Sequence, residues 1–205
     1  IRNRNFFAIT TFDIKDRYIL DGLVRRDGSS LFGPDERWQT YFRVSGAWRA
    51  NEDLKIGGID DLRLRASYGT AGLRPLFDYQ YETFAIEGGA PVKQTLGNRA
   101  LKPARSSELE LGANLELLEG RLSVEYTYAR KETKDQIELA PLSAAAGFPR
   151  QWQNAGTVLG HTHELALGVV VANSRDLYWR VNVAADRTRQ KITEYPLPIR
   201  DRAVA

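Results

Sequence analysis

Apolar and polar residues alternate with a period of two along most of the chain. In the clearest run, Leu109, Leu111 and further apolar positions up to Leu117 alternate with a polar set that includes Glu108 and Glu110. On a β-strand this pattern gives one apolar face and one polar face, whereas a helix would distribute the leucines around its circumference. Seven other segments alternate or are rich in β-forming residues, which predicts eight strands in all: 6–14, 18–25, 41–48, 62–69, 122–129, 164–171 and 177–184.

The lengths of the predicted strands and of their connections favour a membrane barrel. Strands of about 9 to 13 residues exceed the five or six residues common in globular sheets and suit tilted strands that cross an apolar layer. The connections at Lys15–Arg17, Glu119–Gly120 and 173–176 are short, and Asn51–Asp60 is intermediate. By contrast, 27–38, 71–105 and 133–160 are long, and a polar stretch follows Gln190. Short turns at one end and long loops at the other are typical of an outer-membrane barrel, while a compact soluble domain rarely has such loops.

Charged residues fall on the face that this interpretation places in a water-filled lumen, where their desolvation free energy is much smaller than in a dry core. The alternative is the exposed sheet face of a soluble protein. Aromatic residues gather near the predicted strand ends, with Tyr18, Trp48 and Trp179 on the turn side and Tyr41, Tyr68, Tyr126 and Tyr128 towards the long loops. Two interfacial girdles would produce this distribution, although aromatic residues favour strands in general. The predicted lumen-facing residues are Arg63, Arg65, Glu108, Glu110, Glu116, Glu125 and Arg180.

Composition narrows the class of protein further. The 205 residues include no cysteine and no methionine, and the net charge is +3. The lack of cysteine excludes disulfides, cysteine-ligated metals and a thiol nucleophile. The lack of an initiator methionine predicts a mature or internal segment of a longer product. The balanced charge gives no reason to expect a nucleic-acid partner, and no run of about 18 apolar residues predicts a membrane-spanning helix.

Several short sequence blocks follow one another in a fixed order along the chain. The block at 25–33 reads RRDGSSLFG and is followed by Arg37–Trp38 and by SGAWR at 45–49. The block at 62–72 reads LRLRASYGTAG, and LKP at 101–103 precedes ELELG at 108–112. Arg121–Leu122, YTY at 126–128 and Lys134–Asp135 follow, and NAGTV at 154–158 is succeeded by Gly160 and Glu164. In this order the blocks resemble the barrel of SusC/RagA-type TonB-dependent outer-membrane transporters, with Leu159 departing from the family pattern.

The resemblance implies an all-β fold: an antiparallel, up-and-down transmembrane β-barrel segment, with about eight strands of a larger 22-stranded barrel. Residues 1–205 would be a partial barrel domain, with the plug domain and the TonB-contacting segment absent from this chain. The implied function is import of oligosaccharides or peptides across the outer membrane of a Gram-negative bacterium, without enzymatic activity or a cofactor. The implied partners are TonB, a SusD-like surface lipoprotein, the remaining barrel and plug of the same protein, outer-membrane lipid, and an oligosaccharide or peptide ligand.

Aromatic side chains in the long loops are the candidates for ligand contact, because aromatic faces stack on sugar rings and hold peptide side chains. An equally simple interpretation is that they pack the loops against one another. The candidates are Trp38, Phe77, Tyr79, Tyr81, Phe84 and Trp152.

Other chemistry has weaker support. The sequence contains no nucleophile elbow, phosphate-binding loop or zinc-protease motif, so no catalytic residue is assigned. His161 and His163 share one strand face but have no third metal ligand nearby, and they are expected to lie at the loop-side end of their strand. Asp27, Asp35 and Glu36 lack the spacing of a calcium loop. Glu108 and Glu110 share one strand face, as a pair of glycosidase carboxylates would, but every period-two pair in the strand does the same.

Two further hypotheses remain at this point. An open sheet has two unpaired edges that invite strand addition, so one hypothesis is a self-assembling structural sheet that forms filaments or oligomers. The other is a soluble carbohydrate-binding β-sandwich.

Overall fold

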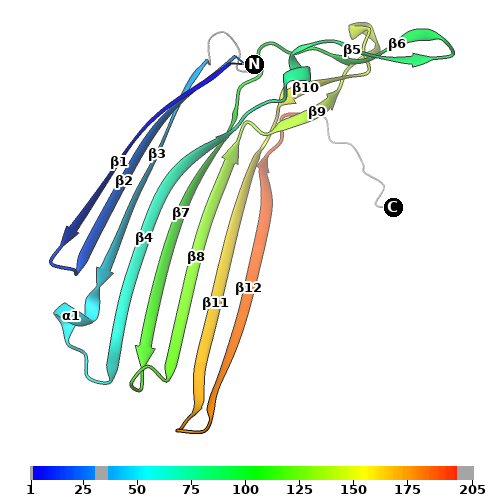
Figure 1. The fold of residues 1–205 in the computed structure, drawn as a ribbon. Helices are drawn as coiled ribbons and strands as arrows, with labels where there is room; N and C mark the ends of the chain where they lie inside the picture. The colour runs from blue at the N-terminus through cyan, green and yellow to red at the C-terminus, as the bar shows by residue number, and fades with distance from the viewer. Residues whose placement is uncertain (1, 31–36, 198–205) are drawn as a thin grey trace.

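The computed structural model describes residues 2–30 and 37–197, and its eight long strands form one curved antiparallel sheet (Figure 1). Each strand pairs with the next long strand along the chain, in the order β1-β2-β3-β4-β7-β8-β11-β12. This up-and-down arrangement confirms the predicted fold class. The strands are β1 (Asn3–Ile14), β2 (Tyr18–Ser29), β3 (Trp38–Arg49), β4 (Ile59–Leu73), β7 (Ala104–Leu117), β8 (Leu122–Lys134), β11 (Thr157–Asn173) and β12 (Tyr178–Glu194).

Four strands have the predicted length of about 9 to 13 residues, namely β1, β2, β3 and β8. The other four are longer, with 14 residues in β7, 15 in β4 and 17 in β11 and β12. Backbone pairing continues past the last apolar residue, as in β2, which reaches Ser29, and β12, which reaches Glu194. The apolar pattern marks only the part of each strand beside an apolar medium, whereas the hydrogen-bond ladder needs only a neighbouring strand.

All the connections that were expected to be short lie at one end of the sheet, the turn end (Figure 1). The β1–β2 turn has positive φ at Lys15 (57°) and Asp16 (54°), and Gly120 in the β7–β8 turn has φ 75°. The intermediate connection contains a short helix, α1 (Ala50–Leu54). Its carboxyl end is capped by Lys55 in the left-handed conformation, whose N–H bonds to the Asn51 carbonyl at 3.1 Å.

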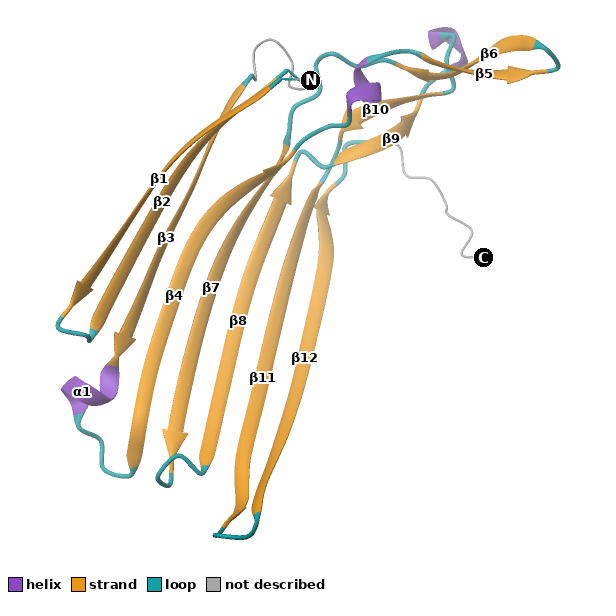
Figure 2. Cartoon of the chain, viewed as in Figure 1, coloured by secondary structure: helices purple, strands orange, loops and turns teal. Residues whose placement is uncertain are grey.

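At the opposite end, the loop end, the long segments 71–105 and 133–160 are ordered, which the sequence pattern did not predict (Figure 2). They contribute a second sheet with the order β5-β6-β10-β9, called the loop sheet below. Buried backbone groups need partners, and here residues far apart in sequence supply them. The elements are η2 (Phe77–Gln80), β5 (Thr83–Glu87), β6 (Ala90–Leu96), β9 (Ile137–Pro141), η3 (Ala144–Ala146) and β10 (Arg150–Asn154).

The eight-stranded sheet is a single layer, with the loop sheet at its end and not on its face (Figure 2). The soluble β-sandwich hypothesis is therefore wrong, because a sandwich needs a second sheet packed face to face on the first. Large apolar side chains of the sheet are exposed, among them Phe6 at 63% and Val183 at 57%. The few buried apolar residues include Tyr41, Leu101 and Phe148, which lie at or near the loop end. In the described part of the chain, no helix has the length and apolarity needed to span a membrane.

A cluster around Asp53 fixes α1 against the turn end. One carboxylate oxygen of Asp53 accepts a hydrogen bond from Arg17 at 2.7 Å. The other accepts bonds from the Tyr18 hydroxyl and from the Trp48 indole N–H, the latter at 2.9 Å. The Tyr18 and Trp48 rings stack with centroids 6.4 Å apart. The hydrogen bond from Tyr18 first, then those from Trp48 and Arg17, hold the pKa of Asp53 below its ordinary value of 3.8.

This lowered pKa predicts a pH-dependent α1. Because the folded-state pKa lies below the unfolded one, the Asp53 contacts stabilise α1 above the unfolded pKa and are lost as pH falls through the folded pKa. Amide protection of α1, corrected for intrinsic exchange, should therefore be constant above about pH 5 and should fall as the pH drops through and below 3.8. Asp53→Asn should show low protection with little pH dependence, whereas Glu52→Gln should behave as wild type. Equal pH dependence in Asp53→Asn would contradict this assignment.

Candidate functional site

The strand register sorts the side chains of the long sheet onto two faces. Residues paired across antiparallel strands point to the same side. Arg63 lies opposite Asn114, which lies opposite Glu125, and Glu116 lies opposite Ser123. Followed across the sheet, this register puts all seven residues predicted to face a lumen on one side, called the polar face: Arg63, Arg65, Glu108, Glu110, Glu116, Glu125 and Arg180.

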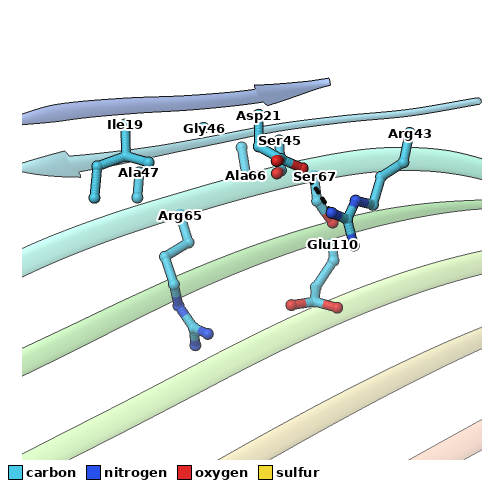
Figure 3. A pocket seen from close by; sticks show the side chains of 10 residues that line it. All are labelled: Ile19, Asp21, Arg43, Ser45, Gly46, Ala47, Arg65, Ala66, Ser67 and Glu110. Atoms are coloured by element: carbon cyan, nitrogen blue, oxygen red, sulfur yellow. Dashed lines mark hydrogen bonds and ion pairs between the residues drawn. The ribbon is translucent and has the colours of Figure 1, made fainter. Parts of the chain in front are cut away.

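Ion pairs on the polar face are short but solvated. Arg65 bonds to Glu125 at 2.9 Å and Arg43 to Asp21 at 2.6 Å, with side chains 20–54% exposed. Exposed pairs of this kind contribute about 0–1 kcal/mol each, so they do not determine the fold. They leave charges of both signs along a hollow of about 450 Å³ (Figure 3). Figure 3 shows Arg65 and Glu110 extending over it from neighbouring strands, without a direct bond between them.

Several polar atoms on this face have no hydrogen-bond partner among the described residues. They include the Nε atoms of Arg49, Arg63 and Arg65 and Oδ1 of Asn114. Arg49, Arg63 and Asn114 lie in one row across β3, β4 and β7, near the turn end. Buried polar atoms are normally satisfied, so this row fits a surface that meets water or further protein.

Two of the aromatic candidates contact each other and join the loop segments. Tyr79 and Trp152 stack with ring centroids 3.9 Å apart and planes 17° apart. Asn98 connects the same two residues, because its N–H bonds to the Tyr79 carbonyl at 2.9 Å and its side-chain amide to the Trp152 carbonyl at 2.8 Å. Burial raises the pKa of the Tyr79 phenol, and the Asp78 carboxylate adds to this rise.

Three other aromatic candidates on the loop side have exposed side chains. Phe77 is the first residue of η2 and Tyr81 directly follows this helix; their ring centroids lie 5.1 Å apart, and the two residues are 52% and 45% exposed. Phe84 on β5 is 52% exposed and meets Phe148 edge to face at 6.0 Å. Sequence reasoning missed Phe148, and also Lys93, whose ammonium lies 4.7 Å from the Phe148 ring centroid. Neither residue stands out locally, because their contact depends on the pairing of the loop sheet.

The sixth candidate, Trp38, lies apart from this group. It belongs to the apolar face of the long sheet, where its register partner is Gly28 on β2. Phe6 stacks on it at 6.1 Å and the Arg26 guanidinium lies 5.4 Å from its ring centroid. Of the seven aromatic residues expected in girdles, six share the apolar face: Tyr18, Trp48, Tyr68, Tyr126, Tyr128 and Trp179. Tyr41 does not, because it lies opposite Arg25 on the polar face and is 4% exposed.

The histidines and carboxylates with weaker assignments have ordinary partners. Nδ1 of His163 lies 2.8 Å from the Tyr126 hydroxyl, and Nδ1 of His161 lies 2.9 Å from that of Tyr128. Asp27 forms an ion pair with Arg25 at 3.0 Å, while Asp35 and Glu36 lie outside the described residues. Glu108 lies 3.7 Å from Lys131. Within the described ranges, no three metal-ligating side chains gather at one point.

A tall curved antiparallel sheet, with one charged face, one apolar face, turns at one end and long loops at the other, is the wall of an outer-membrane β-barrel. Comparison with known proteins identifies the family. The model of the family "TonB dependent receptor-like, beta-barrel" matches residues 1–200, and the chain belongs to this family. Its members are outer-membrane proteins of Gram-negative bacteria.

Two proteins with similar sequences support this membership. The chain is 25% identical over 202 residues to TonB-dependent receptor P26 of Formosa agariphila, covering 93% of the chain and 20% of that protein. It is 22% identical to TonB-dependent receptor SusC of Bacteroides thetaiotaomicron, covering 93% of the chain and 21% of SusC. The chain thus spans about a fifth of the length of these relatives.

Solved structures of outer-membrane transporters contain a segment with the same fold as this chain. A structure of the RagAB peptide importer in the "open-open" state superposes with a TM-score of 0.83 at 25% identity, covering 96% of this chain and 22% of the other. The copper transporter OprC shares the fold alone, with a TM-score of 0.60 at 16% identity over 95% of this chain and 30% of that one.

Proposed function

We propose that this chain forms about eight strands of the barrel of a TonB-dependent transporter that imports oligosaccharides or peptides. The observation that carries the proposal is the sorting of charge in a sheet only one layer thick. One face is apolar enough for lipid, and the other presents both charge signs beside a solvated hollow. A wall with these two faces separates lipid from an aqueous lumen.

The partners proposed for the whole protein follow from this family. TonB would supply energy, a plug would occupy the lumen, and a SusD-like surface lipoprotein would cover the loops. The row of Arg49, Arg63 and Asn114 supports the plug, because it offers unpaired polar atoms near the turn end. The loop sheet supports the lipoprotein, because it presents an ordered surface at the opposite end.

The six aromatic candidates then divide by role. Tyr79 and Trp152 contact each other and hold the loop sheet together, which is the packing role. Trp38 serves as an interfacial residue on the apolar face. The exposed residues Phe77, Tyr81 and Phe84 remain as the ligand contacts.

Peptides are the preferred ligand class. The structural relative named a peptide importer superposes closely on the chain. The polar face also carries both charge signs in alternation, as in Arg43 with Asp21 and Arg65 with Glu125, which complements a substrate with both an ammonium and a carboxylate group.

Uptake by cells that produce the full-length protein tests the proposal. Uptake of labelled peptides and of labelled oligosaccharides is measured with and without TonB, and loss of uptake of one class without TonB is expected. Phe77→Ala with Tyr81→Ala should raise the half-saturating concentration about tenfold through lost aromatic contacts. Leu118→Ala, an exposed apolar residue of the turn end, is the control. Uptake of both classes that persists without TonB would refute the proposal.

A further inference from the structure

The apolar face of the long sheet carries an unexpected concentration of positive charge near its loop end. The strands contribute eight basic residues there and two acidic residues: Glu132, which lies 4.0 Å from Lys134, and Glu194, which accepts a hydrogen bond from the Thr157 hydroxyl at 3.2 Å. The turn-side part of the same face contains no lysine or arginine in the described strands. The eight residues, called the basic belt, are Arg4, Arg26, Arg105, Arg130, Lys134, Arg187, Arg189 and Lys191.

The belt lies directly beyond a band of apolar residues of membrane dimensions. On β7 the band extends from Leu117 to Leu109, and Arg105 follows after Ser107. These nine residues span about 27 Å along the strand, or about 20–25 Å of height once the strand is tilted. That height agrees with the apolar band of about 25 Å on outer-membrane barrels. The belt therefore lies at the level of the headgroups on the loop side.

The belt is also level around the wall. The row of paired residues that begins at Arg187 on β12 reaches β2 at Leu20. The belt residue on β2 is Arg26, which lies six residues nearer the loop end than Leu20. Six strand-to-strand steps separate β2 from β12, so the belt advances one residue per strand. With a rise of about 3.4 Å and a spacing of about 4.8 Å, this advance corresponds to a strand tilt of about 35°, as in transmembrane barrels. Tilted strands thus bring distant basic residues to one height.

The densest part of the belt lies on β8, β11 and β12. Arg130, His161 and Arg189 form one row, and Tyr128, His163 and Arg187 form the row below it. Each histidine has Nδ1 beside a tyrosine hydroxyl, at 2.8 and 2.9 Å. When that hydroxyl donates, the neutral imidazole carries its proton on Nε2, which then is a donor for an anion.

These arginines need an anion that the described chain does not supply. Arg130, Arg187 and Arg189 are exposed and have no carboxylate partner among the described residues. Unpaired charge beside the apolar layer is costly, and the planar guanidinium matches phosphate in a bidentate fashion. A belt of one sign at headgroup height is complementary to lipids that carry phosphate in that leaflet.

We propose that Arg130, Arg187 and Arg189, with His161 and His163, form a binding site for the phosphorylated glycolipid of the outer leaflet. The site binds the phosphate groups on the glycolipid sugars, and the acyl chains lie against the apolar rows below, which include Leu165 and Val183. The inference rests on the outer-membrane location of the barrel and does not depend on what the transporter imports.

Lipid binding by the purified full-length protein tests the site. After delipidation in detergent, the protein is titrated with diphosphorylated lipid A, with its phosphate-free form, with phosphatidylglycerol and with inorganic phosphate, and bound lipid is counted by native mass spectrometry. Arg130→Gln with Arg189→Gln should weaken diphosphorylated lipid A binding about 10- to 30-fold. The matched control, Arg25→Gln with Lys131→Gln, removes the same charge from the polar face and should leave binding unchanged.

The outcomes separate the alternatives. Equal binding of diphosphorylated and phosphate-free lipid A, equal loss in both double variants, or tighter binding of phosphatidylglycerol than of lipid A would each overturn the site. Full retention of lipid A by the Arg130→Gln/Arg189→Gln protein would do the same. Because the readout is bound lipid, failure here leaves TonB-dependent uptake standing, and failure of uptake leaves the lipid site standing.

Discussion

Replacing Leu167 with arginine is expected to lower the free energy of unfolding of the membrane-embedded protein by about 2–4 kcal/mol. Leu167 lies on the apolar face of β11, between Val124 on β8 and Val183 on β12. The apolar run of this strand extends from Leu165 to Val171, so the new guanidinium would lie near the middle of the bilayer. No carboxylate on the neighbouring strands of that face lies beside this position to pair with it.

The neighbouring residue provides the control. Ala166 points to the polar face, opposite Glu125 and Ala184, so Ala166→Arg should change stability by less than about 1 kcal/mol. Urea unfolding of the full-length protein in lipid vesicles measures both variants. Equal destabilisation of the two would mean that the faces have been assigned to the wrong media.

Replacing Gly97 with alanine is expected to detach η2 from the loop sheet. A Cβ at Gly97 would lie 2.6 Å from the Gln80 carbonyl oxygen and 2.7 Å from the Tyr81 carbonyl carbon, which are backbone atoms that cannot rotate away. Overpacking of this kind costs about 1–3 kcal/mol. Relief by backbone movement would break the Asn98–Tyr79 hydrogen bond and the Tyr79–Trp152 stack.

Limited proteolysis of the intact, membrane-embedded protein reports this change. Cleavage in residues 77–96 should accelerate about fivefold or more in Gly97→Ala, while the barrel resists unfolding as before. Gly57→Ala is the matched control, because its Cβ would have nothing within 4 Å. Unchanged protection in Gly97→Ala would show that the loop sheet does not depend on this close approach.

The long strands were predictable because each faces two media along its length. In β7 and β8 the alternation from Leu109 to Leu117 and from Leu122 to Tyr128 is imposed by lipid on one side and water on the other, and the register keeps it in phase. A local pattern therefore carries the information needed for the wall. The strand ends were less predictable, since Ser29 and Glu194 are paired beyond the apolar band.

The loop sheet was not predictable from local patterns. Its central contact is a short parallel pairing of Thr95 with Arg150 and of Leu96 with Gln151, between segments far apart along the chain. Only two residue pairs define it, and no periodicity marks either side. The aromatic candidates were recognised by type, but the stack of Tyr79 on Trp152 depends on this pairing. Hence the sequence did not separate packing aromatics from exposed ones.

The parallel pairing of β6 with β10 also has an evolutionary consequence. It joins the two long outer segments into one sheet, and Asn98 adds a second link through its bonds to Tyr79 and Trp152. Selection for a new ligand cannot reshape residues 77–96 without disturbing the surface against which residues 137–154 pack. Homologues that differ in specificity are therefore expected to exchange the two segments together, as one heritable unit, while the wall beneath diverges at its own pace.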